Sequence, residues 1–201
     1  AAWATGKIWF KVPESMKVVV TGKFKPGVSA KDFILKFIGD VRADGADYMS
    51  VEFHGEGIED MSIAERMTIC NMGIEFGAKN AVCRPDQKVL DAIKNNAKCD
   101  RWEPLWADED AVYAAEYHYD LGDIEPGVAK PHKVDNYAPI SEVKGTPIHE
   151  AFLGSCTNGR IEDLRLAAGI LKGKKIAVRT IVIPASWIVY RQAMKEGLFD
   201  I

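Results

Sequence analysis

The sequence lacks a long apolar run and lacks the layout of a secretion signal. None of its 201 residues belongs to a stretch near the roughly 20 apolar residues that a membrane-spanning helix needs. Residues 1–7 do not show the charged-then-apolar order of a signal peptide. Because 47% of the side chains are hydrophobic, the chain can bury a substantial core. We therefore expect a globular protein with a cytoplasmic location.

An excess of one charge is also absent. The 26 lysines and arginines nearly balance the 29 aspartates and glutamates, for a net charge of -3. Basic and acidic residues alternate along the chain, so no large phosphate-binding surface is expected. Nucleic acid is accordingly not an expected partner.

Cysteine is scarce and widely spaced. The four cysteines are Cys70, Cys83, Cys99 and Cys156. Their spacing fits neither a compact disulfide framework nor a C-x-x-C metal site. A metal cluster in this protein would therefore need ligands from outside this sequence.

Residues 17–21 form the first predicted strand. A helix is then predicted to open at Ser29, because Asp32 follows three residues later in a capping box. The buried stripe of this helix is predicted to consist of Phe33, Ile34, Phe37, Ile38 and Val41.

A second strand is predicted over residues 48–53. Ser62 and Glu65 then predict another capping box, with a helix that continues to about Phe76 before Gly77. His54, in the glycine-containing segment after the strand, is a weak candidate for the site, because a loop histidine without a named partner more often has a structural role.

The signals weaken over residues 78–129, where we predict a helix at 87–95 and a partly alternating strand at 113–121. They become clear again after residue 146. There the order is strand, turn, helix, strand, turn, helix, which is typical of a parallel sheet with covering helices. The predicted bounds are 148–153, 161–171, 177–183 and 188–196.

These patterns predict an α/β protein of two units with mainly parallel sheets. The first unit covers residues 1–130, and the second covers 147–201. The proline-containing stretch 131–146 is predicted to link them. The second unit stops where its next strand is expected, and the aromatic start has no element before it. We therefore expect a chain truncated at both ends.

Cys156 lies in residues 154–160, GSCTNGR, between a predicted strand and a predicted helix. Open α/β sheets bind ligands at this position. The dipole of the following helix favours the thiolate, the form that binds metal or attacks carbon. A small buried thiol and a nucleophile are the alternatives, although His149 is poorly placed to act as its base. The spacing alone leaves all three open.

The sequence is similar to the aconitase superfamily, in its isopropylmalate dehydratase and homoaconitase branch. The stretch AFLGSCTNGR at 151–160, followed by EDLR at 162–165, resembles the first cluster-cysteine motif. The stretch TICNMGIEFGA at 68–78 resembles a second family motif, and the segments 4–14 and 184–186 also fit, in the family's order. The resemblance covers essentially the whole chain, although Trp187 stands where relatives usually carry a charge, often arginine.

The resemblance implies two aconitase-type three-layer α/β units, the second one incomplete, and a 4Fe-4S cluster held by three cysteines. Cys156 matches the first of these metal ligands, and the other two would lie beyond this sequence. Asn71 is implied near the cluster, and Glu75 is implied to contact the hydroxyl or water at the open iron. Four residues apart on a helix, they would share one face. Cys70, Cys83 and Cys99 match no ligand position and are interpreted as buried or incidental thiols.

The implied reaction is the dehydration and rehydration of a hydroxy polycarboxylate, with iron as the Lewis acid. Isopropylmalate in leucine biosynthesis is the first expected substrate, homoaconitate the second, and the implied partner is a small subunit. Two further hypotheses are a non-catalytic scaffold domain and a cysteine-dependent enzyme without iron. The fragment alone is expected to be inactive.

Overall fold

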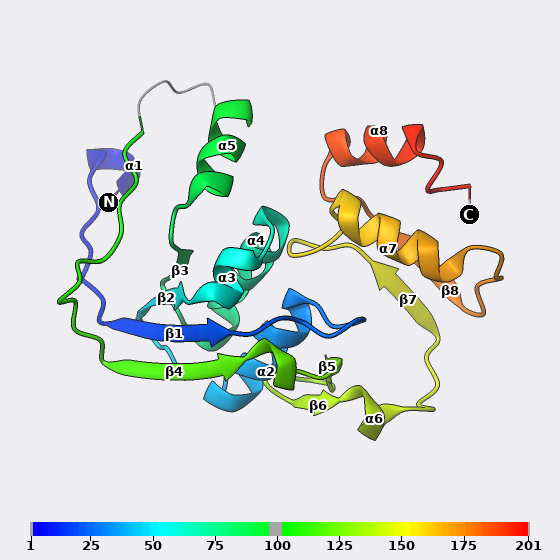
Figure 1. The fold of residues 1–201 in the computed structure, drawn as a ribbon, viewed down its shortest axis with the longest axis horizontal. Helices are drawn as coiled ribbons and strands as arrows, with labels where there is room; N and C mark the ends of the chain where they lie inside the picture. Colours follow the sequence, from blue (N-terminus) through cyan, green and yellow to red (C-terminus); the bar gives the residue numbers. More distant parts are fainter. Residues whose placement is uncertain (1, 97–101, 201) are drawn as a thin grey trace.

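The computed structural model describes residues 2–96 and 102–200, so Cys99 lies outside the described residues. A four-stranded sheet with its helices forms one body, and a smaller strand-and-helix body follows at the C-terminal end (Figure 1). Within the described ranges, no helix has the length and apolar character needed to cross a membrane.

The main sheet consists of β1 (Ser15–Thr21), β2 (Ser50–His54), β3 (Asn80–Cys83) and β4 (Ala115–Asp120). Its order is β3-β2-β1-β4, and every neighbouring pair is parallel. The structure confirms the α/β class and the predicted parallel sheet. The three-layer arrangement of complete aconitase-type units stays a prediction.

Helix α2 (Ala30–Val41) begins as predicted at Ser29. The Asp32 carboxylate accepts hydrogen bonds from the backbone N–H and the hydroxyl of Ser29, both at 2.8 Å. This cap satisfies the backbone N–H at the helix start, which would otherwise be left unpaired. The predicted apolar stripe is buried, and Phe33 and Phe37 pack on Phe53 of β2.

Helix α4 (Ile63–Asn71) follows the short α3 (Glu56–Asp60), and the capping box of Ser62 and Glu65 is present as predicted. The backbone then tightens into a 3-10 helix, η1 (Met72–Phe76), which ends at Gly77 in the left-handed region with φ 89°. The helix ends at the predicted residue, but its last turn is not α-helical.

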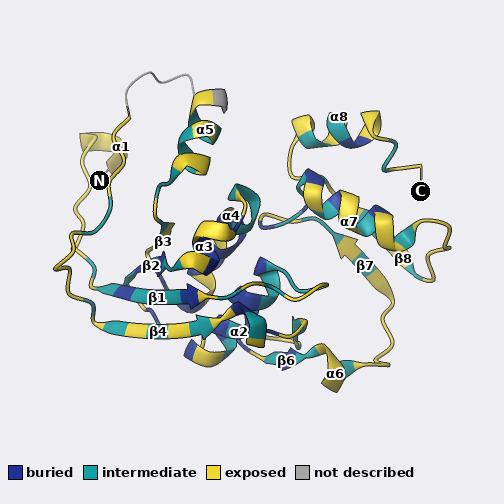
Figure 2. Cartoon of the chain, in the orientation of Figure 1, coloured by how far each residue is buried: buried dark blue, intermediate teal, exposed yellow. Residues whose placement is uncertain are grey.

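The core lies on one face of the main sheet. Alternate residues of the central strands, including Met16, Val18 and Val51, are buried against α2 and α4 (Figure 2). The other face carries polar side chains instead, among them Lys17 and Glu52. This alternation is typical of a strand buried on one side only.

Helix α5 (Gln87–Asn96) and β4 agree with the weaker predictions. A short 3-10 turn, η2 (Leu121–Asp123), follows β4. The antiparallel pair β5 (Gly127–Ala129) and β6 (Tyr137–Pro139) then packs beside α2, and α6 (Ile140–Val143) follows. The predicted linker thus carries a strand and a helical turn, while the proposed domain limits stay a prediction.

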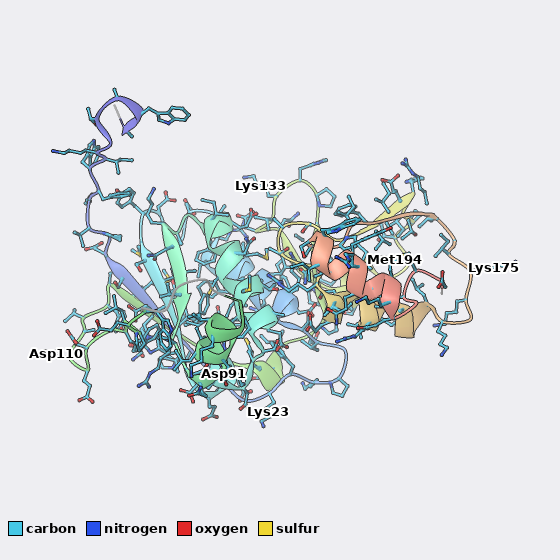
Figure 3. All side chains as sticks on the ribbon, turned by 90° about the horizontal axis from the view of Figure 1, so that it is seen from above. Lys23, Asp91, Asp110, Lys133, Lys175 and Met194 are labelled. Atoms are coloured by element: carbon cyan, nitrogen blue, oxygen red, sulfur yellow. The ribbon has the colours of Figure 1, made fainter. Side chains whose placement is uncertain are left out.

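The C-terminal body contains β7 (Glu150–Leu153), α7 (Ile161–Leu171), β8 (Arg179–Val182) and α8 (Trp187–Lys195), in the predicted order. Strands β7 and β8 are parallel. Lys175 and Met194 mark this body in Figure 3, at the opposite end of the molecule from Asp110. The N-terminal segment with α1 (Ala2–Thr5) projects away from the main sheet in the same view.

Candidate functional site

The loop between β7 and α7 carries Cys156 and is held tightly by its backbone. A Cβ atom on Gly154 would lie 2.4 Å from the Ile183 carbonyl oxygen, and one on Gly159 would lie 2.7 Å from the same atom. The Ala185 N–H also donates to the Gly159 carbonyl at 2.7 Å. Because these approaches exclude a side chain, both glycines are required by the close packing of the loop on the end of β8.

The thiol of Cys156 is exposed at the turn of this loop. Ser155, the residue before it, has φ 99°, which is unusual for a residue with a side chain. On the other side, Thr157 is only 5% exposed. The loop therefore presents the cysteine outward while its neighbour is fixed inward, against the main body.

Thr157 joins the two bodies through a polar cluster. Its hydroxyl oxygen accepts a hydrogen bond from Lys31 Nζ of α2 at 3.0 Å. Its carbonyl oxygen accepts one from Thr68 Oγ1 of α4 at 3.2 Å, and Arg160 donates to both the Thr157 carbonyl and the Thr68 hydroxyl. We call these four residues, Lys31, Thr68, Thr157 and Arg160, the joint.

A cleft of about 330 Å³ lies beside the joint, where the first turns of α2, α4 and α7 converge. At the start of each helix a carboxylate accepts a hydrogen bond from the backbone N–H of the N-cap residue; these carboxylates belong to Asp32, Glu65 and Asp163 respectively. Lys31 and Arg160 are the cationic side chains that line the cleft among the described residues.

Lys31 connects the predicted site residues electrostatically. Burial lowers the pKa of its ammonium group, and the charges of Cys156, Glu75 and Asp163 oppose that shift. One partly buried cation thus lies within electrostatic range of both Cys156 and Glu75. No sequence pattern indicates a role for Lys31, because its partner is 126 residues away in the chain.

Asn71 and Glu75 are both exposed. Asn71 is the last residue of α4, and Glu75 lies in the 3-10 turn. With three residues per turn there, positions four apart no longer lie on one face, so the predicted shared helical face is wrong for this pair. Their assigned roles are not tested by this geometry.

His54 lies away from the Cys156 loop, on the polar face of the main sheet. Its Nε2 is 3.0 Å from Glu52 Oε2, and Tyr113 donates to the same carboxylate oxygen at 2.7 Å. The ring also packs on Trp106 at 4.9 Å between centroids. His54 therefore has structural partners that its loop position in the sequence did not indicate.

The described residues contain no group of three or more histidine, cysteine, aspartate or glutamate side chains placed to hold a metal ion. Cys156 fits a cluster as a single thiolate ligand, since its sulfur is exposed on a rigid loop beside a cation. Further ligands would have to come from outside these ranges.

The structure is that of a parallel α/β protein whose exposed Cys156 lies between a strand and a helix, the position at which open α/β sheets bind ligands. Comparison with protein families then identifies the chain itself: residues 1–147 and 141–201 match the aconitase family (aconitate hydratase). The chain belongs to the aconitase family. The resemblance found from the motifs is thereby confirmed.

Several large subunits are similar to this chain at about half of all positions. A probable methanogen homoaconitase large subunit of Methanosarcina mazei is 52% identical over 99% of the chain and 51% of its own length. A 3-isopropylmalate dehydratase large subunit of Halothermothrix orenii is 51% identical over 100% of the chain and 48% of its own length. A 3-isopropylmalate dehydratase large subunit 1 of Methanopyrus kandleri is 48% identical, again over 100% of the chain and 48% of its own length. The chain spans about half the length of these curated relatives.

Proposed function

We propose that this chain is part of the large subunit of a 3-isopropylmalate dehydratase that interconverts 2-isopropylmalate and 3-isopropylmalate. The observation that carries the proposal is the GSCTNGR loop in a chain of the aconitase family, with its thiol exposed beside the cationic joint. The relatives are named as large subunits, which supports a small subunit as partner. The three-layer form of both units belongs to the same proposal.

Cys156 is proposed as one of three thiolates that hold a 4Fe-4S cluster. When bound, this group supplies a Lewis-acid iron that polarises a substrate hydroxyl and carboxylate. The loop holds the cysteine in a fixed position, because Gly154 and Gly159 pack closely against the Ile183 carbonyl and Lys31 donates a hydrogen bond to Thr157. A thiolate on a fixed loop beside a cation needs little reorganisation to become a ligand.

Glu75 is proposed to transfer the proton that dehydration and rehydration require, and Asn71 to orient the substrate by hydrogen bonding. A carboxylate is suited to general acid and base work. Glu75 also lies within electrostatic range of Lys31, whose ammonium group donates to Thr157 in the Cys156 loop. Both residues are exposed in the described chain, so each is free to meet a substrate.

Homoaconitase is the second candidate activity, favoured by the 52% identity to the methanogen homoaconitase large subunit. The two substrates differ in one side chain. In isopropylmalate it is the apolar isopropyl group, and in homoaconitate it is a chain that bears a carboxylate. Steady-state kinetics with both substrates, on the complete large subunit mixed with its small subunit, would separate them. Turnover of homoaconitate at a higher kcat/KM than isopropylmalate would replace the first proposal by the second.

Cys156→Ala in the complete large subunit provides the test of the cluster ligand. After anaerobic reconstitution, we expect loss of bound iron, labile sulfide and the visible absorbance of the cluster. Cys70→Ala is the matched control, since it removes a thiol on the far side of α4 and is expected to retain the cluster. Equal cluster content in Cys156→Ala and wild type would exclude the assignment.

Glu75→Gln tests the proton-transfer role, because it keeps the shape of the side chain but removes its charge. We expect kcat to fall about 100-fold to 10,000-fold, with near-normal KM and an intact cluster absorbance. Glu59→Gln, at an exposed residue of α3, serves as the matched control. Activity of Glu75→Gln within about threefold of wild type would remove Glu75 from the catalytic role.

A further inference from the structure

Two cysteines outside the candidate site lie side by side. Cys70 Sγ of α4 and Cys83 Sγ, at the end of β3, are 3.6 Å apart. Thirteen positions separate them in the sequence, and no motif relates them. A disulfide has its sulfurs about 2.05 Å apart, so a small movement of the two side chains would bring them to bonding distance.

The pair faces away from the joint. Cys70 follows Thr68 by two positions on α4, so their side chains point to nearly opposite sides of the helix. Thr68 contacts the Cys156 loop, whereas Cys70 faces β3 and α5. The two thiols therefore do not belong to the proposed cluster site.

Both sulfurs line a largely apolar pocket of about 450 Å³. The other lining residues come from α4 and α5, and they are Ile63, Arg66, Met67, Val89, Ala92 and Ile93. Both cysteines are only partly exposed, so bulky polar reagents have limited access to them. The pocket has room for a small apolar molecule directly against the sulfurs.

A fixed cation lies on the same side of α4. The buried guanidinium of Arg66 donates to the Ile58 and Glu59 carbonyls and pairs with Asp86. The hydrogen bond with the Cys83 thiol lowers the pKa of Cys70; burial opposes this shift, and the charge of Arg66 adds to it. The pKa of Cys83 is raised by the same hydrogen bond and by burial. Cys70 is thus the thiol that ionises first.

We propose that Cys70 and Cys83 form a redox-active dithiol, a site at which a small apolar disulfide oxidises the pair to an intramolecular disulfide. The thiolate of Cys70 attacks one sulfur of the disulfide RS–SR, which forms Cys70–SR and releases RS⁻. Cys83, after losing its proton, attacks the Cys70 sulfur and releases the second RS⁻. Each released RS⁻ takes up one of the two thiol protons. Two protein thiols are thereby oxidised, and RS–SR is reduced to two RSH.

The oxidised pair would have a defined effect on the chain. The new bond would connect α4 directly to the edge strand β3 and enclose residues 71–82 in a closed loop. That loop contains Asn71 and Glu75. Oxidation would therefore restrict the conformations of the segment that carries both proposed catalytic residues. The dithiol chemistry itself does not depend on the role of those residues.

The test uses the 201-residue chain in a Cys99→Ser, Cys156→Ser background, in which only the pair remains. We expect 4,4'-dithiodipyridine, a small aromatic disulfide, to release two equivalents of thiopyridone per folded chain. The protein should lose two hydrogens in mass and gain no reagent group. Non-reducing peptide mapping should then show the Cys70–Cys83 crosslink.

Single substitutions separate the two steps. Cys83→Ser should release one equivalent and retain one reagent group on Cys70, whereas Cys70→Ser should react more slowly at Cys83. Two reagent groups on the folded parent chain, or a crosslink that forms only in denaturant, would overturn the proposal. The parent chain alone separates these outcomes from the expected one, so the test holds even if a serine variant folds poorly.

Discussion

The two bodies of this molecule follow the same strand-and-helix order but differ in how much apolar surface they bury. The main body packs a continuous core between a four-stranded sheet and its helices, with the rings of Phe33, Phe37, Phe53 and Phe76 fully buried. The cluster of the C-terminal body has Ile161, Leu164 and Ala193 as its buried members. The local sequence pattern thus defines where helices and strands form, whereas the stability of each body depends on how much apolar surface these elements bury.

The difference also appears on the surface. In the C-terminal body, Phe152, Ile170, Ile183 and Ile188 are each more than half exposed. The joint supplies polar contacts in place of a shared apolar core. We therefore expect the main body to unfold as a cooperative unit and the C-terminal body to open at a lower free energy.

Phe37→Ala should have the largest effect. The ring is fully buried and packs on Phe76 and Tyr119 at 5.1 and 5.7 Å between centroids, so its loss should cost about 4 kcal/mol. Leu164→Ala, in the smaller cluster, should cost about 2 kcal/mol. Hydrogen exchange of amides in α2 would report the stability of the main body, and exchange in α7 would report that of the C-terminal body. An equal loss of protection in α2 for both variants would break the comparison, because it would make the two bodies one cooperative unit.

Thr157→Val should have an intermediate effect, because it keeps the shape of the side chain but removes the acceptor of Lys31. Hydrogen bonds to charged groups contribute about 1.5 to 3 kcal/mol, and we expect a loss in that range. Faster proteolysis between residues 144 and 150 is the measurement. Thr180→Val is the matched control, since that hydroxyl donates to the Val178 carbonyl two positions away in the chain. Equal cleavage of both variants would mean that the joint does not hold the bodies together.

Ser62→Ala and Ser186→Ala should have the smallest effects. Each serine hydroxyl accepts from a backbone N–H three residues later, at 3.2 Å in α4 and 3.3 Å in α8. Loss of such a cap costs about 1 kcal/mol. We expect the loss to lower the urea midpoint of the main body for Ser62→Ala, and to appear only as faster amide exchange in α8 for Ser186→Ala. A lowered urea midpoint for both variants would contradict the expectation that the C-terminal body opens separately, at a lower free energy than the main body.

Local chemistry makes much of the fold predictable from the sequence. Helix α7 has the predicted bounds 161–171, and the capping boxes at Ser29 and Ser62 form as expected. These features depend on residues three or four positions apart. The tightened turn after Asn71 is not predictable in this way, because hydrophobic period does not separate α from 3-10 geometry over a single turn.

The site is only partly predictable, for the same reason. Cys156 stands in a local motif that the sequence displays, whereas Lys31 and Thr68 reach the loop only through tertiary packing. From the sequence, Cys70 and Cys83 are interpreted as buried or incidental thiols. Their contact depends on α4 packing across β3, a pairing that no sequence spacing encodes.

The close approach of Gly154 and Gly159 to the Ile183 carbonyl has a consequence for how the loop can change in evolution. Both glycines pack against the same carbonyl oxygen, which follows the end of β8. The position of the cysteine loop therefore depends on the residues after β8, although about 25 positions separate the two segments. A one-residue insertion after Val182 would displace that oxygen and carry the loop with it. Substitutions at Cys156 itself leave the backbone unaffected. Insertions and deletions near β8 are therefore expected to move the thiol more than most point substitutions within the loop do.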